Sequence, residues 1–131
     1  MDARSGALRL ANLSLTDHRP YLEHYQAQGY EVEPDPGGIV LSVGLAPEEI
    51  CRQAVDAVRR VVAEGYDGAI VGGRPDAVCY MRDALVASGL RCYAADTARM
   101  LDREGYFVAM PVGLVEILPA AGAADERDAN G

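Results

Sequence analysis

The chain has 131 residues, half of them hydrophobic, and a formal net charge of −8 at neutral pH. This length fits one domain with a buried core, and the acidic balance argues against a protein that tracks long DNA or RNA, because such proteins present a basic face. All twelve basic residues are arginines, which excludes a Schiff-base lysine and a P-loop lysine. A phosphate site in this chain would therefore use arginine or backbone N–H groups.

The apolar runs are far shorter than a membrane span, and the first residues (MDARSG) lack the apolar segment of a signal peptide. We therefore expect a cytoplasmic protein with no membrane partner. Cys51, Cys79 and Cys92 form no CxxC pair, so we expect reduced thiols and no metal site. No motif indicates a cofactor.

Residues 7–14 predict a first strand that is covered on both faces. A polar loop follows, and then a short helix over residues 21–28. Thr16 or Asp17 is the predicted cap of this helix, and Gly29 is its predicted end.

The next segment predicts two further pieces of strand around a turn. Residues 30–33 form a short strand, and residues 34–38 form a turn, because two prolines and two glycines continue neither periodicity. Residues 39–43 are rich in β-formers and are expected to be strand as well. The pattern leaves open whether these strands form a hairpin or one strand with an inserted loop.

Residues 47–64 carry the strongest helical pattern, with proline at the start and Gly65 at the end. The apolar stripe at helical spacing consists of Ile50, Ala54, Val58, Val61 and Val62. The opposite face is charged and is expected to be a solvated surface.

The stretch 67–76 (DGAIVGGRPD) predicts a buried strand that turns at two glycines into a helix over residues 76–88. Val78, Met81, Leu85 and Val86 are expected to face inward, and Gly89 is expected to end the helix. Residues 91–95 predict a fourth strand, which should end in a polar loop over residues 96–99.

The last elements predict a hairpin, with strands at 99–102 and 106–110 around a turn at 103–105. Because Pro111 interrupts the ladder, residues 112–118 are either a further strand or a bulged continuation. From residue 119 the chain is an acidic segment without periodicity that we expect to be disordered.

Alternation of strands and helices up to residue 95 predicts a mainly parallel sheet. The expected fold class is α/β: a single Rossmann-like three-layer domain over residues 1–118, with helices on both faces of the sheet and a C-terminal β-hairpin.

Three polar loops follow predicted parallel strands, at residues 14–19, 72–76 and 96–99. Ligands in open α/β sheets bind outside the carboxyl ends of the strands, so these loops define the predicted site. The candidate ligand-binding residues are Ser14, Thr16, Gly72, Gly73, Arg74, Thr97 and Arg99.

Each of these residues also has a purely structural interpretation. Arg74 and Arg99 are candidate phosphate ligands, or they form salt bridges with Asp76 and Asp96. His18 is a candidate general acid or base, or it is a surface or capping residue.

Over roughly residues 7–118, the order of elements and short motifs resembles that of one protein family. The features in common are the strand ending Asn12-Leu13-Ser14, the GG loop before a helix, the strand ending in residues 95–99 and the terminal hairpin. The family consists of small stand-alone CRISPR-associated proteins with a CARF-like Rossmann fold, of the ring nuclease type. The resemblance implies a homodimer of antiviral defence that binds cyclic oligoadenylate across its two-fold axis.

When the family's ligand contacts are placed on this sequence by position, the resemblance implies that the cyclic ligand is touched by Ser14, Gly73, Arg74, Thr97 and Arg99. It implies a metal-independent phosphodiesterase in which a ribose 2′-hydroxyl attacks the neighbouring phosphate. His18, Arg74 and Arg99 would be the catalytic residues. The alternatives are a non-catalytic module that binds a nucleotide or other small phosphorylated ligand, and an enzyme that acts on another phosphorylated metabolite.

Overall fold

The computed structural model describes residues 6–118, except for the side chains of residues 96–99 and 108–112. The acidic segment expected to be disordered from residue 119 lies outside the described residues. The elements in chain order are β1 (Leu8–Leu13), the 3-10 turn η1 (Arg19–Tyr21), α1 (Leu22–Ala27), β2 (Tyr30–Val32), α2 (Pro47–Ala63), β3 (Gly68–Val71), α3 (Pro75–Ala87), β4 (Arg91–Leu101) and β5 (Phe107–Glu116).

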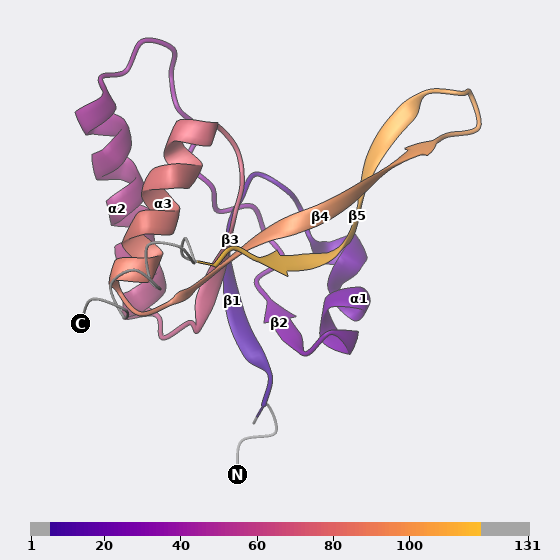
Figure 1. Ribbon diagram of the computed structural model, residues 1–131, viewed down its shortest axis with the longest axis horizontal. Helices are drawn as coiled ribbons and strands as arrows, with labels where there is room; N and C mark the ends of the chain where they lie inside the picture. Colours follow the sequence, from indigo (N-terminus) through magenta and orange to yellow (C-terminus); the bar gives the residue numbers. More distant parts are fainter. Residues whose placement is uncertain (1–5, 119–131) are drawn as a thin grey trace, which may run out of the picture.

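These elements form one five-stranded sheet in the order β2-β1-β3-β4-β5. The first four strands are parallel, and β5 runs antiparallel to β4. Helices α2 and α3 lie together on one side of the sheet, and α1 lies on the other (Figure 1). This arrangement confirms the predicted Rossmann-like α/β fold. None of the helices in the described part of the chain is long and apolar enough to cross a bilayer.

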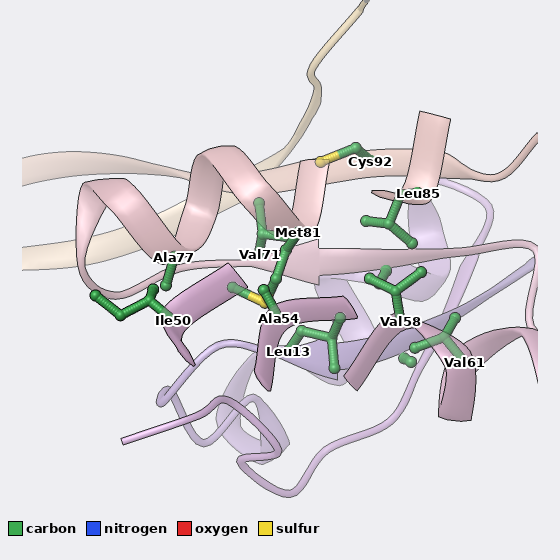
Figure 2. Close-up of a cluster of buried hydrophobic side chains, with 12 residues drawn as sticks. Leu13, Ile50, Ala54, Val58, Val61, Val71, Ala77, Met81, Leu85 and Cys92 are labelled. Carbon is green, nitrogen blue, oxygen red and sulfur yellow. The ribbon is translucent and has the colours of Figure 1, made fainter. Parts of the chain in front are cut away.

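The two faces of the sheet build two apolar clusters, because successive strand residues point to opposite sides. Leu10, Ile70 and Tyr93 point toward α1 and pack with its Tyr25. The opposite cluster, beneath α2 and α3, is shown in Figure 2; its labelled members are Leu13, Ile50, Ala54, Val58, Val61, Val71, Ala77, Met81, Leu85 and Cys92. Each fully buried large aliphatic side chain contributes roughly 1.5–3 kcal/mol to stability.

Two apolar residues of the predicted helix stripes remain exposed to solvent. Val62 keeps 48% of its surface accessible, and Val86, which was expected to face inward, keeps 40%. Both lie at the margin of their helix's buried face, because only part of each helix contacts the sheet.

The prediction of a strand over residues 39–43 is wrong, since this segment has no regular secondary structure. Gly37 and Gly38 both donate their N–H to the carbonyl oxygen of Ser14, at 3.2 and 2.9 Å. These bonds use the edge of β1 that a further strand would need. The chain beyond them instead leads to α2, with Ile39 and Leu41 packed against the core. We call residues 34–46 the covering segment.

The prediction of a polar loop at residues 96–99 is also wrong, because β4 continues through these residues without a break. β5 supplies the missing ladder, from Tyr93↔Glu116 to Leu101↔Phe107. The register shifts where Asp96 and Thr97 pair with Gly113 and Pro111, so residues 112–116 are a bulged continuation of the strand, one of the two alternatives that the sequence left open. Figure 1 shows this hairpin projecting far beyond the sheet. We call its outer part, residues 97–111, the arm.

Candidate functional site

The strand order reverses between β1 and β3, which makes their carboxyl ends the topological switch point of the sheet. From β1 the chain moves outward to β2, then crosses back over β1 to enter β3. The two central strands are in register from Leu10↔Gly68 to Leu13↔Val71, so they end at the same height. The loops that follow them are therefore neighbours, as the sequence predicted for these two strands.

The closest contact between these loops is made by Ser14 and Gly72. A Cβ atom placed on Gly72 would lie 3.0 Å from the Cβ of Ser14, which is tighter than ordinary van der Waals contact. The adjacent Gly73 has φ +113°, a conformation that side chains disfavour. We call Ser14, Thr16, Gly72, Gly73 and Arg74 the switch-point site.

Arg74 stands at the N-cap of α3 and is held by its neighbours. Its Nε and Nη2 donate to the two carboxylate oxygens of Asp76 at 3.2 and 2.7 Å, and its Nη1 donates to the carbonyl oxygen of Ser42 at 3.4 Å. Asp76 in turn accepts the N–H of Ala77, at 2.9 Å, in the first turn of the helix. The salt-bridge alternative for Arg74 is therefore present in the structure.

The Arg74 guanidinium lowers the pKa of Asp76 through their hydrogen bonds, so this carboxylate is charged at neutral pH. Both side chains are partly exposed, at 43% and 39%. Exposed ion pairs contribute only about 0–1 kcal/mol. A phosphate group can therefore replace Asp76 as the partner of Arg74 at little cost.

Thr97 and Arg99 do not join the switch-point site through their own chain. The pairing of β4 with β3 ends at Ile70↔Tyr93, and the strand then runs outward into the arm. At about 3.3 Å per residue, Thr97 and Arg99 lie roughly 13 and 20 Å further along the strand than Tyr93. Their side chains lie outside the described part of the structure.

Asn12 organises the end of β1 from a fully buried position. Its Nδ2 donates to the carbonyl oxygens of Thr16 and Asp35, at 2.8 and 3.0 Å. Its Oδ1 accepts the backbone N–H of Ser14 at 3.0 Å and the Ser14 hydroxyl at 2.6 Å. One amide thus ties the β1 loop to the covering segment and fixes the serine.

His18 is also fully buried and extends this network into the α1 layer. Its Nε2 lies 3.2 Å from the hydroxyl oxygen of Ser14, and its Nδ1 lies 3.0 Å from the hydroxyl oxygen of Tyr25. The histidine and tyrosine rings also meet edge to face, with centroids 5.4 Å apart.

The partners assign the direction of the hydrogen bonds from Asn12 through Ser14 to Nε2 of His18. Because the Asn12 amide nitrogen faces two carbonyl oxygens, its oxygen must accept, and the Ser14 hydroxyl must donate to it. The serine oxygen therefore accepts the Nε2–H of His18, and in the neutral ring Nδ1 accepts from the hydroxyl of Tyr25. In this arrangement His18 is neutral and cannot take a proton from Ser14.

Burial lowers the pKa of His18, and the nearby Asp17 carboxylate opposes this only in part. The buried surroundings therefore favour the neutral ring, in which the hydrogen bond to Ser14 places the proton on Nε2. The predicted general acid has both ring nitrogens occupied, and it can act on a ligand only if the network opens.

Asp17 does not cap α1, whose N-cap is Tyr21. Its carboxylate accepts the backbone N–H of Arg19, at 3.0 Å, and the guanidinium of the same residue, at 2.7 Å. These bonds bring the pKa of Asp17 to about 2. Asp17 therefore stabilises the turn that starts η1, on the solvent side of the site.

Glu33, for which the sequence predicted no role, is the second residue that anchors the end of β1. Glu33 accepts the N–H of Asn12 at 3.2 Å, the hydroxyl of Tyr66 at 2.9 Å and the Arg60 guanidinium at 3.3 Å. Burial alone would raise the pKa of Glu33, but these hydrogen bonds outweigh it and lower the pKa. A polar residue at the end of an apolar strand, as at Asn12 and Glu33, was the signal available in the sequence.

Within residues 6–118, no three histidine, cysteine or acidic side chains are grouped so that they could hold a metal ion. No known protein-family model matches the chain, and no curated protein resembles it at the level of sequence.

Proposed function

We propose that this protein binds a small phosphorylated ligand, of the cyclic oligoadenylate class, at the switch-point site. The observation that carries the proposal is the open backbone of Gly73, which has no atom within 4 Å of its Cβ position, at the point where α3 begins at Arg74. Glycines let a ligand approach the main chain, and the start of a helix favours an anion. The cyclic oligoadenylate class comes from the resemblance in sequence pattern.

A small ligand also agrees with the charges of the chain. The net charge of −8 disfavours a long polyanion, whereas one exchangeable arginine suits a ligand with few phosphates. The ligand would displace Asp76 from the guanidinium of Arg74, and the exposed Thr16 would contribute its hydroxyl. The Ser14 hydroxyl is buried and bonded to Asn12 and His18, so Ser14 would support the loop from beneath.

Cleavage is the second part of the proposal. The 2′-hydroxyl of a ribose attacks the adjacent phosphorus and loses its proton to water, the bond to the 5′-oxygen breaks, and a 2′,3′-cyclic phosphate results without a metal. The protein would hold the in-line geometry, Arg74 and Arg99 would stabilise the developing charge, and His18 would protonate the leaving oxygen. Because Arg99 lies on the arm, its participation fits a homodimer in which the second copy supplies it.

One observation favours the alternative of a binding module without catalysis. Both ring nitrogens of His18 have internal partners, so the site as folded presents no histidine to a ligand. A protein that binds the messenger without cleaving it would sequester it or report its presence.

The decisive experiment incubates purified protein with labelled cyclic tetraadenylate in EDTA, with binding read by native gel and products by chromatography. We expect Arg74→Ala to weaken binding by about 10- to 100-fold, since a hydrogen bond to a charged group contributes about 1.5–3 kcal/mol. Arg82→Ala is the matched control: this arginine lies on the same helix, has the same exposure (42%) and pairs with a neighbouring aspartate.

Asp76→Asn completes the set, because it removes the carboxylate that competes for Arg74 and should strengthen binding. Equal affinities of wild type and Arg74→Ala would remove Arg74 from the site, and failure of the wild type to bind would reject the ligand class. Linear products with a cyclic phosphate end would establish cleavage. Tight binding without products would establish the binding module.

A further inference from the structure

Two apolar surfaces of this protein are exposed and lie far from the switch-point site. The first is the tip of the arm, made by Met100, Leu101, Tyr106 and Phe107, which expose 50–71% of their surfaces. Leu101 and Phe107 face each other across the last pair of the ladder, so they present one apolar knob. Exposed clusters of this kind mark interaction surfaces.

The second surface is a groove of about 470 Å³ between α2 and α3. Its walls are Val55, Val58, Val62, Ala63, Ala84 and Ala87. It opens to solvent beside Val62, the residue of the predicted apolar stripe that the sheet leaves uncovered. The small alanines on both helices make room for larger side chains from outside, and the volume is within the range that holds an apolar ligand.

We propose that the arm tip of one copy inserts into the α2–α3 groove of another copy of this chain. Apart from Arg59 at its border, the groove is lined by valine, alanine and serine, whereas the tip consists of larger apolar side chains that could fill it. A two-stranded hairpin is marginally stable in water unless another element covers it. Beyond Tyr93 the described pairing of β4 is with β5, and burial of the tip would supply this cover.

The contact must form between copies, because the arm points away from the helix pair of its own chain (Figure 1). The arm tip and the groove are different surfaces, so two arrangements satisfy the contact: each copy passes its arm to the next, or two copies exchange arms reciprocally. Neither surface contains switch-point residues. An arm seated in this groove holds its Arg99 away from the switch-point site, because Arg99 is only two residues from Leu101 on β4. This association and a two-fold dimer in which the second copy supplies Arg99 are therefore alternative uses of the arm.

Charges at the edges of the two surfaces favour the same pairing. The turn at the arm tip carries Asp102, Arg103 and Glu104, a net charge of −1, while the side chain of Arg59 borders the groove and is 77% exposed. Arg59 is paired with Asp56 at 3.3 Å, on a solvated surface where such pairs are weak. An acidic group of the arm can meet Arg59, and Arg103 can meet Asp56.

The test uses two variants of the full chain. Phe107→Glu places a charge on the apolar arm tip but keeps the groove intact. Val62→Glu places a charge beside the groove but keeps the arm tip intact. Both side chains are exposed, at 70% and 48%, so both variants should fold. The chain has no lysine, so an amine-reactive dye labels only the N-terminus at Met1. Donor- and acceptor-labelled proteins are then mixed, and energy transfer is followed against concentration.

We expect energy transfer between Val62→Glu and Phe107→Glu, because one intact knob meets one intact groove. Each variant mixed with itself should associate at least tenfold more weakly than this pair. Equal transfer in all three mixtures would overturn the proposal and indicate a different interface, such as a two-fold dimer. No transfer in the mixed pair would overturn it as well. Leu101→Gln with Ala63→Gln repeats the test with uncharged side chains, should either glutamate variant unfold.

Discussion

Buried polar side chains, rather than charged ones, hold the carboxyl end of β1. Asn12 satisfies two carbonyl oxygens, one backbone N–H and one hydroxyl from a position without solvent contact. Buried groups that lose their partners cost about 1–3 kcal/mol each. The switch-point loops therefore depend on this side chain, although it does not face a ligand.

We expect Asn12→Ala to lower the free energy of unfolding by about 2–4 kcal/mol, because it leaves several buried polar groups without partners. Urea unfolding followed by circular dichroism measures the change. Gln53→Ala is the control: it removes an amide that bonds Glu49 on the face of α2, and it should cost less than about 0.5 kcal/mol. Equal losses in the two variants would show that the Asn12 network adds nothing to stability.

His18 should make stability depend on pH. Its pKa is lowered in the folded state from the usual 6.5, so the unfolded chain takes up a proton first as the pH falls. The contribution of the neutral ring is therefore complete well above pH 6.5 and is lost below it. Between pH 7.5 and 5.5 the wild type should lose at most about 1.4 kcal/mol from this group.

His18→Gln keeps hydrogen-bonding groups on the side chain but does not titrate. The variant should be less stable than the wild type at pH 7.5, and the difference between them should shrink at pH 5.5. Urea unfolding at both values measures it. A constant difference would show that another group titrates in this window.

The sequence placed Ser14, Gly72 and Arg74 at one edge of the sheet, because the pattern of strand, glycine pair and proline-opened helix is local. It could not place His18 in the interior. A polar loop looks solvated in sequence, and the ring is buried only because Tyr25 of α1 and Ser14 of β1 close around it. Those contacts depend on how α1 packs on the sheet, which the local pattern does not contain.

At the scale of elements, the two errors in the predicted strands have one physical origin. A strand exists only where a neighbour supplies its ladder. Residues 39–43 have β-forming side chains but no free edge beside them, whereas residues 96–99 look like a loop but have β5 as a partner. The presence or absence of a partner strand in the tertiary structure therefore determined the secondary structure of both segments.

The close packing of the covering segment on β1 allows a direct test. A Cβ atom on Gly38 would lie 2.8 Å from the carbonyl carbon of Ser14 and 2.9 Å from the carbonyl oxygen of Leu13. Since both are backbone atoms, Gly38→Ala should cost about 1–3 kcal/mol. It should also speed amide exchange at Gly37 and Gly38.

Hydrogen exchange with mass spectrometry, together with urea unfolding, measures both effects. Ser42→Ala is the control, because Ser42 lies on the same segment with an exposed side chain. If the alanine at position 38 leaves exchange unchanged, the covering segment does not rest on β1 as described.

On the scale of the whole molecule, stability depends on the sheet held between its two layers of helices. Cys92 lies in β4 beneath α3, fully within the cluster of Figure 2, and burial raises the pKa of its thiol to about 11. At pH 8 the reactive thiolate is then on the order of one part in a thousand. Reagents should reach this thiol only when the sheet and helices separate.

We therefore expect the Cys51→Ser/Cys79→Ser variant, in which Cys92 is the one remaining cysteine, to react with a disulfide reagent through global unfolding. The logarithm of the reaction rate should rise linearly with urea, with the slope that circular dichroism gives for complete unfolding. Cys79 is exposed, so a variant that keeps only this cysteine should react quickly at every urea concentration. A Cys92 rate that does not depend on urea would mean that β4 separates from α3 locally, without global unfolding of the sheet.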